Sequence, residues 1–118
     1  MQDPQIITLA IPADAAFVRT VRQVVGAAAS AVPDRIDDVR LAVSEAIALA
    51  LSTGTGPLEL TIAVTDDALS ITVPLAELPA ASAPDEVDVA ALIDALTDAA
   101  VPSPAGLVLT WVIDAPAV

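Results

Sequence analysis

The chain of 118 residues contains no histidine, cysteine, lysine or tyrosine. The absence of histidine and cysteine excludes imidazole bases, thiol nucleophiles, disulfides and the usual zinc sites. The absence of lysine excludes P-loop and Schiff-base chemistry. Any catalysis would have to use carboxylates, hydroxyls, backbone amides and arginine. These absences favour a binding module over an enzyme.

Acidic residues far outnumber basic ones, 16 against four, and the net charge of −12 disfavours nucleic-acid binding, which needs a basic surface. The four cations lie close together in the sequence, as Arg19, Arg22, Arg35 and Arg40. We take Arg19, Arg22 and Arg40 as a candidate surface that binds the carboxylates of a partner protein. Local pairing of these arginines with Asp37 or Asp38 is the alternative.

The length suits one domain, residues 1–118, built around one core. Hydrophobic residues make up 56% of the chain. The longest charge-free stretch, Ala99 to Ile113, contains two prolines and is shorter than the roughly 20 apolar residues of a spanning helix. The first residues lack the basic segment of a signal peptide. We therefore expect a cytoplasmic protein without a membrane segment.

Hydrophobic periodicity predicts secondary structure in the order β-α-α-β-β-α-β. The predicted strands are residues 5–11, 58–64, 69–73 and 106–113. The predicted helices run from 14 to about 32, from 34 to about 52, and from 85 until residues 102–105 break the helix. A proline-rich loop is predicted for residues 74–84. This order predicts an α+β two-layer sandwich, with three helices on one face of a mixed, mostly antiparallel four-stranded sheet. We expect Phe17 and Trp111 in its core.

The sequence of residues 40–51 is RLAVSEAIALAL. It resembles the second helix of the GHKL ATPases (histidine-kinase-like and Hsp90-like), and in particular that of the anti-sigma-factor serine kinases, which reads L-A-V-S-E-A-x-x-N-A. Weaker likenesses occur at Val18-Arg19, at Asp37-Asp38 and in the L-x-x-x-L-x-D pattern of residues 92–98. The resemblance covers nearly the whole chain, and the LAVSEA run is its specific part.

The resemblance implies three nucleotide-binding elements, and this chain departs from each of them. Leu49 replaces the asparagine that holds magnesium, and Leu75 replaces the aspartate that binds adenine. Val89 and Ala91 lie where a glycine-rich box would supply amides to the phosphates. Carboxylates within residues 85–88 would repel an anion there. We therefore expect neither ATP nor magnesium to bind.

Glu45 occupies the position of the family's presumed general base. A base without a bound substrate has no task, so we interpret Glu45 as vestigial, and as an ordinary helix acid. Leu41, Leu49 and Leu75 are expected to close the former pocket by apolar packing. The resemblance thus implies a degenerate histidine-kinase-like ATPase fold that is not an enzyme.

The function implied by these residues is that of a non-catalytic, ATP-independent, anti-sigma-factor-like regulator of transcription. Its expected partner is a protein, such as a sigma factor or a STAS-type anti-anti-sigma factor, and relatives of this kind often form homodimers. One alternative is a divergent ATP-binding serine/threonine kinase anti-sigma factor. A second alternative is a structural or dimerisation subunit.

Overall fold

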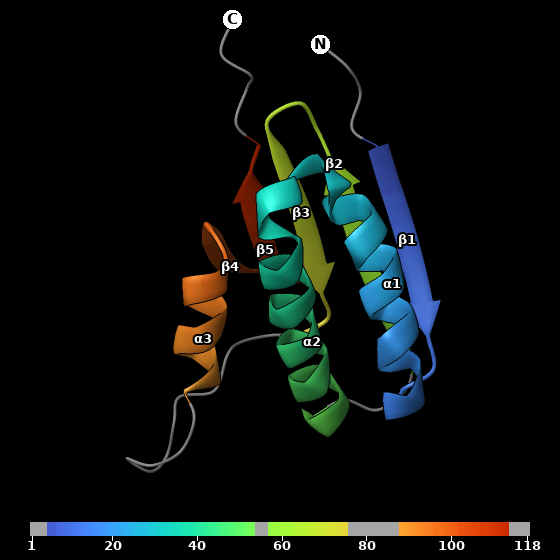
Figure 1. The fold of residues 1–118 in the computed structure, drawn as a ribbon. Coiled ribbons are helices and arrows are strands. Elements are labelled where there is room, and N and C mark those ends of the chain that lie inside the picture. The colour runs from blue at the N-terminus through green and yellow to red at the C-terminus, as the bar shows by residue number, and fades with distance from the viewer. Residues whose placement is uncertain (1–4, 54–56, 76–87, 114–118) are drawn as a thin grey trace, which may run out of the picture.

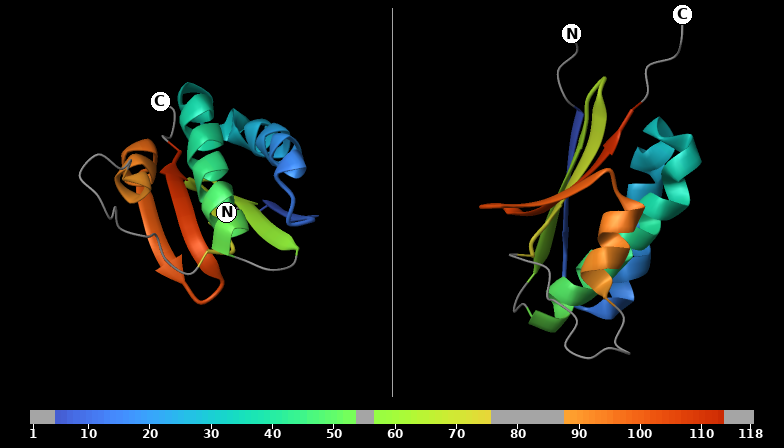
Figure 2. Two further views of the ribbon diagram at one scale, coloured as in Figure 1. Left: turned by 90° about the horizontal axis from the view of Figure 1, so that it is seen from below. Right: turned by 90° about the vertical axis from the view of Figure 1, so that its left-hand side faces the viewer.

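The computed structural model describes residues 5–53, 57–75 and 88–113 of the chain (Figure 1). They form an α+β two-layer sandwich in which the helices cover one face of a five-stranded antiparallel sheet (Figure 2). The strands, in the spatial order β1-β2-β3-β5-β4, are β1 (Gln5–Ile11), β2 (Leu58–Val64), β3 (Ala68–Val73), β5 (Gly106–Val112) and β4 (Ala99–Ser103). The helices are α1 (Val18–Ala28), α2 (Ile36–Thr53) and α3 (Val89–Leu96).

The sheet confirms the predicted fold class and differs from the prediction in two details. It has one strand more than predicted, β4, and all of its strand pairs are antiparallel. The third helix ends at Leu96, because Thr97 adopts an extended backbone and its hydroxyl donates to the Ile93 carbonyl at 2.9 Å. The chain then continues as β4, and β5, which follows after a tight turn, pairs antiparallel with it. Pro102 fits there because β4 is an edge strand, where a missing N–H costs no ladder hydrogen bond.

A tight turn joins β4 to β5 and requires glycine at its end. Gly106 has a φ of +138°, a conformation that side chains rarely permit. A Cβ atom at Gly106 would also collide with the Val73 carbonyl of β3. The β4–β5 hairpin therefore packs against the end of β3 with no room for a side chain.

The predicted first helix and the predicted hairpin are both confirmed. The Asp14 carboxylate accepts from the Ala16 amide at 2.9 Å and begins the helical segment, which runs through α1 to a final 3-10 turn at Ala29–Ala31. Between β2 and β3, the Thr65 hydroxyl accepts from the amides of Asp67 and Ala68. In these two segments, the local capping residues, turn residues and hydrophobic periodicity were sufficient to predict the secondary structure.

The core lies between the helices and the inner face of the sheet. Trp111 is fully buried, as predicted, and its indole N–H donates to the Leu96 carbonyl at 2.8 Å. The prediction for Phe17 is wrong, because its side chain is 39% exposed at the start of α1. The other large, fully buried side chains come from all three helices and from the three central strands, and include Val21, Val25, Val39, Ile47, Leu60, Ile62, Leu69, Ile71, Ile93, Leu107 and Leu109.

Some expectations fall outside the described residues. These are the loop beyond Leu75, the helix end at Gly54 and Gly56, and the carboxylates of Asp85 and Glu86. Among the residues that are described, no helix is both long enough and apolar enough to cross a bilayer.

Candidate partner-binding face

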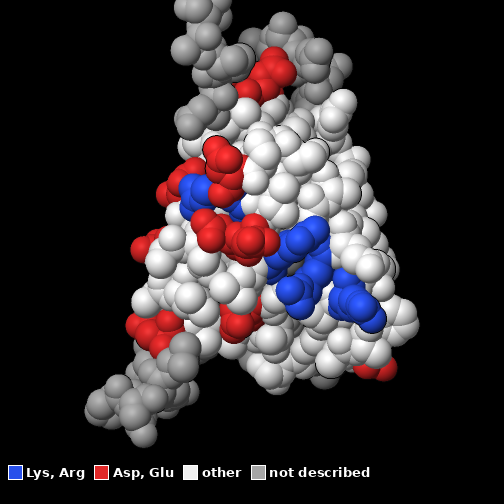
Figure 3. All heavy atoms as spheres, viewed as in Figure 1, with Lys and Arg blue, Asp and Glu red and all other residues white. Residues whose placement is uncertain are grey.

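Three of the four arginines meet on the helical side of the molecule. Arg19 and Arg22 lie one turn apart on α1, and Arg40 reaches them from α2. Together with Gln23 they line an open hollow of about 330 Å³, which we call the arginine hollow. Figure 3 shows basic side chains gathered over α1 and α2, whereas most of the other charged side chains on this face are acidic. The structure thus brings together the three residues that the sequence singled out.

Gly26 of α1 gives Arg40 its place in this hollow. Gly26 is buried on α1, where it lies against the side chain of Arg40 from α2. A Cβ atom there would lie 2.6 Å from both Nε and Nη2 of Arg40, well inside van der Waals contact. The guanidinium of Arg40 therefore lies against the α1 backbone at a point where only glycine leaves room for it. This contact positions one cation of the hollow, whereas Arg19 and Arg22 are exposed.

Arg35 has a different environment. Its Nε donates to the Asp38 carboxylate at 2.8 Å, its Nη1 to Asp98 at 3.2 Å and its Nη2 to the Leu96 carbonyl at 3.2 Å. The Asp38 and Asp98 carboxylates raise the pKa of Arg35. The Val112 amide donates to Asp98 at 2.7 Å, and this bond, with help from Arg35, lowers the pKa of the Asp98 carboxyl.

Within the described part of the chain, none of the three hollow arginines has a carboxylate within the 4.0 Å of an ion pair. The expected local alternative placed these arginines beside Asp37 or Asp38. Asp38 instead pairs with Arg35, at 2.8 Å. The guanidinium groups of the hollow are therefore available to an anion from outside the described structure.

At the positions where the sequence resemblance implied a nucleotide site, the side chains pack against the core or cap a helix. Leu75, just after β3, is 5% exposed and belongs to the core, and Leu49 and Val89 pack against that core. Asp88 caps α3, since its carboxylate accepts from the Ala91 amide at 3.1 Å. An intramolecular carboxylate thus already occupies this helix N-terminus.

Glu45 lies half-buried on α2. Leu41, on the same helix, is 42% exposed. The expectation that Leu41 closes a former pocket is therefore wrong, because its side chain points to solvent. Among the described residues no group of carboxylates is arranged to hold a metal ion.

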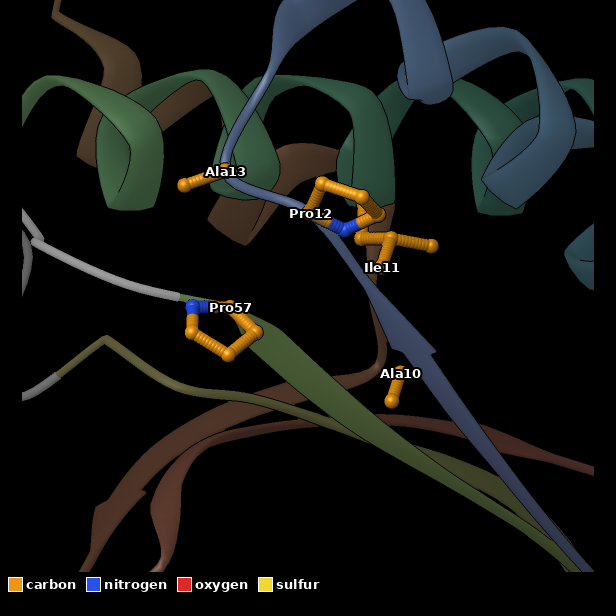
Figure 4. Close-up of a pocket in the computed structure, with 5 residues that line it drawn as sticks. All are labelled: Ala10, Ile11, Pro12, Ala13 and Pro57. Atoms are coloured by element: carbon orange, nitrogen blue, oxygen red, sulfur yellow. The ribbon is translucent and has the colours of Figure 1, made fainter.

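Sequence reasoning missed a second feature, at the end of β1. Ala10, Ile11, Pro12 and Ala13 line an open, mostly apolar hollow of about 510 Å³ with Pro57, which precedes β2 (Figure 4). The nearby β1 residues Ile6 and Ile7 are 61% and 44% exposed. The only sequence signal was an uncharged apolar strand, which does not reveal whether the strand is central or at an edge.

No protein-family model and no curated protein sequence matches the chain. The resemblance of residues 40–51 to the GHKL ATPases therefore stays an expectation, and the function has to be argued from the arginine hollow itself.

Proposed function

We propose that the protein is a non-catalytic, ATP-independent regulator that binds an acidic segment of another protein in the arginine hollow. The observation that carries this proposal is the grouping of Arg19, Arg22 and Arg40, with no ion-paired carboxylate among the described residues, on a chain of net charge −12. Guanidinium groups bind carboxylates through paired N–H donors.

Electrostatics define the kind of partner. The acidic remainder of the surface repels anions, so an acidic segment gains attraction only where the arginines cluster. The ligand must therefore present several carboxylates close together, as an acidic protein segment does. A sigma factor or a STAS-type anti-anti-sigma factor, the partners implied by the sequence resemblance, could each supply such a segment.

Two observations support independence from ATP. Leu49 and Leu75 contribute to apolar packing at positions where a nucleotide site would need oxygen ligands. At the first turn of α3, the Asp88 carboxylate takes the Ala91 amide that a phosphate would need. Without a bound nucleotide there is no phosphoryl donor, so a general base at Glu45 would have no transfer reaction to assist.

The first experiment measures binding of a fluorescein-labelled polyglutamate peptide by fluorescence anisotropy. Arg19→Gln/Arg22→Gln removes two charges from the hollow and leaves a shorter, neutral polar side chain at each position. The control, Ala48→Glu/Ala95→Glu, changes the net charge by the same amount at exposed positions of α2 and α3. We expect the first variant to weaken binding at least about tenfold and the control to change it by less than about threefold. Equal losses in both variants would contradict the proposal.

Calorimetry with Mg-ATP tests the kinase alternative. We expect no saturable heat of binding at ATP concentrations up to about millimolar. ATP is itself an anion, and any binding of ATP to the arginine hollow would disappear in Arg19→Gln/Arg22→Gln. Saturable binding that persists in that variant would therefore establish a separate nucleotide site and overturn ATP independence.

A further inference from the structure

The two edges of the sheet differ in how far they are protected against an added strand. β4 has five residues and contains Pro102, which cannot donate a backbone hydrogen bond. β1 has seven residues with no proline and no charge, and no described strand pairs with its outer edge. Half of its backbone N–H and C=O groups therefore point away from β2. This edge offers a ladder of hydrogen bonds to an extended segment.

The side chains of β1 leave both sides of this edge accessible. Ile7 lies on the face of the sheet that the helices cover, because its partner on β2 is the buried Ile62. Ile6 and Ala10 lie on the opposite face, which no described helix covers and which we call the bare face (Figure 2). Both isoleucines are exposed. A strand added to β1 would therefore meet apolar side chains on each of its two faces.

Carboxylates flank this uncharged strand at both of its ends. Glu59 of β2 lies directly opposite Ala10, on the bare face, and its side chain is exposed. Asp66 and Asp67 are exposed in the β2–β3 turn, beside the first residues of β1. Among the described residues none of these three acids belongs to an ion pair, and the four arginines all lie within the helical segment 19–40. A partner that complements this edge has to bring cations to both ends of the strand.

We propose that β1 binds an extended segment of another protein, in which apolar residues are combined with basic ones, as a sixth strand. The added strand runs antiparallel to β1, like every other strand pair of this sheet. In strand addition, backbone hydrogen bonds supply affinity and the alternate side chains supply specificity. Charge selects this occupant over a second copy of the chain. In an antiparallel pair of two β1 strands, the Glu59 end of each copy would lie beside the acidic β2–β3 turn of the other.

The Ala10 end of the edge fits an arginine or lysine of the added strand. A residue opposite Ala10 lies two strand spacings from Glu59, roughly 10 Å between Cα atoms, and only the alanine methyl group lies between them on the bare face. A long basic side chain crosses this small residue and reaches the Glu59 carboxylate. The mostly apolar hollow of about 510 Å³ that Ala10 forms with Pro12 and Pro57 accommodates its aliphatic stem (Figure 4).

The register then gives the partner a sequence pattern. When a basic residue lies opposite Ala10, the residues one and three positions later lie opposite Leu9 and Ile7, on the helix-covered face, and should be apolar. The residue five positions later lies opposite Gln5, next to the acidic β2–β3 turn, and should be basic. A peptide that follows this pattern is Val-Arg-Val-Thr-Val-Val-Lys.

The first measurement is fluorescence anisotropy with this peptide, labelled with fluorescein. We expect a dissociation constant of about 10–100 μM, because the interface of a single added strand is small. Replacing the central Thr-Val by two prolines keeps the charge and removes an amide that faces β1, whichever alternate set of amides pairs. This second peptide should bind at least about tenfold more weakly. Equal binding of the two peptides would show attraction by net charge alone and overturn the proposal.

Two matched pairs of substitutions locate the site on the protein. Glu59→Gln and Asp94→Asn each remove one exposed carboxylate, the second on α3 at the other side of the molecule (Figure 1). Ile6→Lys and Val101→Lys each add one cation to an edge strand, at residues that are 61% and 56% exposed. We expect Glu59→Gln to weaken peptide binding about two- to fivefold and Ile6→Lys at least about tenfold, whereas the α3 and β4 variants change it by less than about 1.5-fold.

All four substituted positions are exposed, so circular dichroism should show that every variant folds. Losses that are equal within each matched pair would show that the peptide does not bind at β1. Arg19→Gln/Arg22→Gln should leave binding of the basic peptide intact, so this site and the arginine hollow are tested independently. Sedimentation of the chain without peptide tests the other occupant. A dimer that Ile6→Lys dissociates and that excludes the peptide would show that a second copy occupies β1, and would contradict the proposal.

Discussion

Arg35 and the arginine hollow are two basic regions of one surface with opposite environments. Arg35 donates hydrogen bonds within the molecule, to Asp38, Asp98 and the Leu96 carbonyl. Through these bonds it links the start of α2 to the end of α3 and to the β4–β5 hairpin. The hollow arginines make no such ion pairs with described residues. The same residue type therefore stabilises the fold in one region and stays available for binding in the other.

Because of this difference, substitutions in the two regions should affect two different properties, the free energy of unfolding and anion binding. Changes around Arg35 should lower the free energy of unfolding and leave anion binding unaffected. Changes in the arginine hollow should do the reverse. A substitution that affected both properties together would break the distinction.

The largest effect on stability is expected at Asp98. Asp98→Ala removes the acceptor of both the Val112 amide and Arg35, so we expect a loss of about 1–2 kcal/mol, limited by partial exposure to solvent. Urea unfolding measures this loss. Asp94→Ala is the charge-matched control, because Asp94 is exposed on α3, and it should change stability by less than about 0.5 kcal/mol. Similar losses in the two variants would contradict a specific role for Asp98.

A pH series sharpens the same point. The Val112 amide and Arg35 lower the pKa of Asp98 in the folded protein, so the native state binds fewer protons at this site than the unfolded chain. Its stabilising contribution is therefore full above the unfolded value of about 3.9 and is lost as the pH falls through the lowered folded pKa. The stability difference between the unsubstituted chain and Asp98→Asn should be constant above about pH 5 and shrink below about pH 4. A difference that grew towards acid would contradict this sign.

The contrast also shows what the sequence could predict. The β2–β3 hairpin and the first two helices follow from local periodicity and turn residues, and the structure confirms them. β4 was missed because its five residues, AAVPS, carry little strand signal of their own. Their pairing with β5 and the bond between Asp98 and Val112 define this strand, and neither is visible from local periodicity.

The arginines show the same limit. The sequence singled out Arg19, Arg22 and Arg40 as one candidate binding surface, and in the structure all three line one hollow. The separate role of Arg35 depends on Asp98, which is 63 residues away in the chain, and no local pattern could supply that pairing. The need for glycine at position 26 likewise arises between two helices.

The smallest effect on stability, with a large effect on binding, is expected for Gly26→Ala. Alanine favours a helix interior over glycine by about 0.5–1 kcal/mol, and the new Cβ would displace only the flexible end of Arg40. We therefore expect urea unfolding to show unchanged or slightly increased stability. Binding of the polyglutamate peptide should weaken by about three- to tenfold, because the guanidinium of Arg40 leaves its position.

A double-mutant cycle tells positioning from any other role of Gly26. If Gly26 acts on binding by leaving room for Arg40, then Gly26→Ala should weaken peptide binding in the unsubstituted chain and have no further effect once Arg40 is Gln. Arg40→Gln alone supplies the reference, and its stability should stay within about 0.5 kcal/mol of the unsubstituted chain, unlike that of Asp98→Ala. Additive losses would show that Gly26 affects binding independently of Arg40, and would contradict its role in positioning the Arg40 guanidinium.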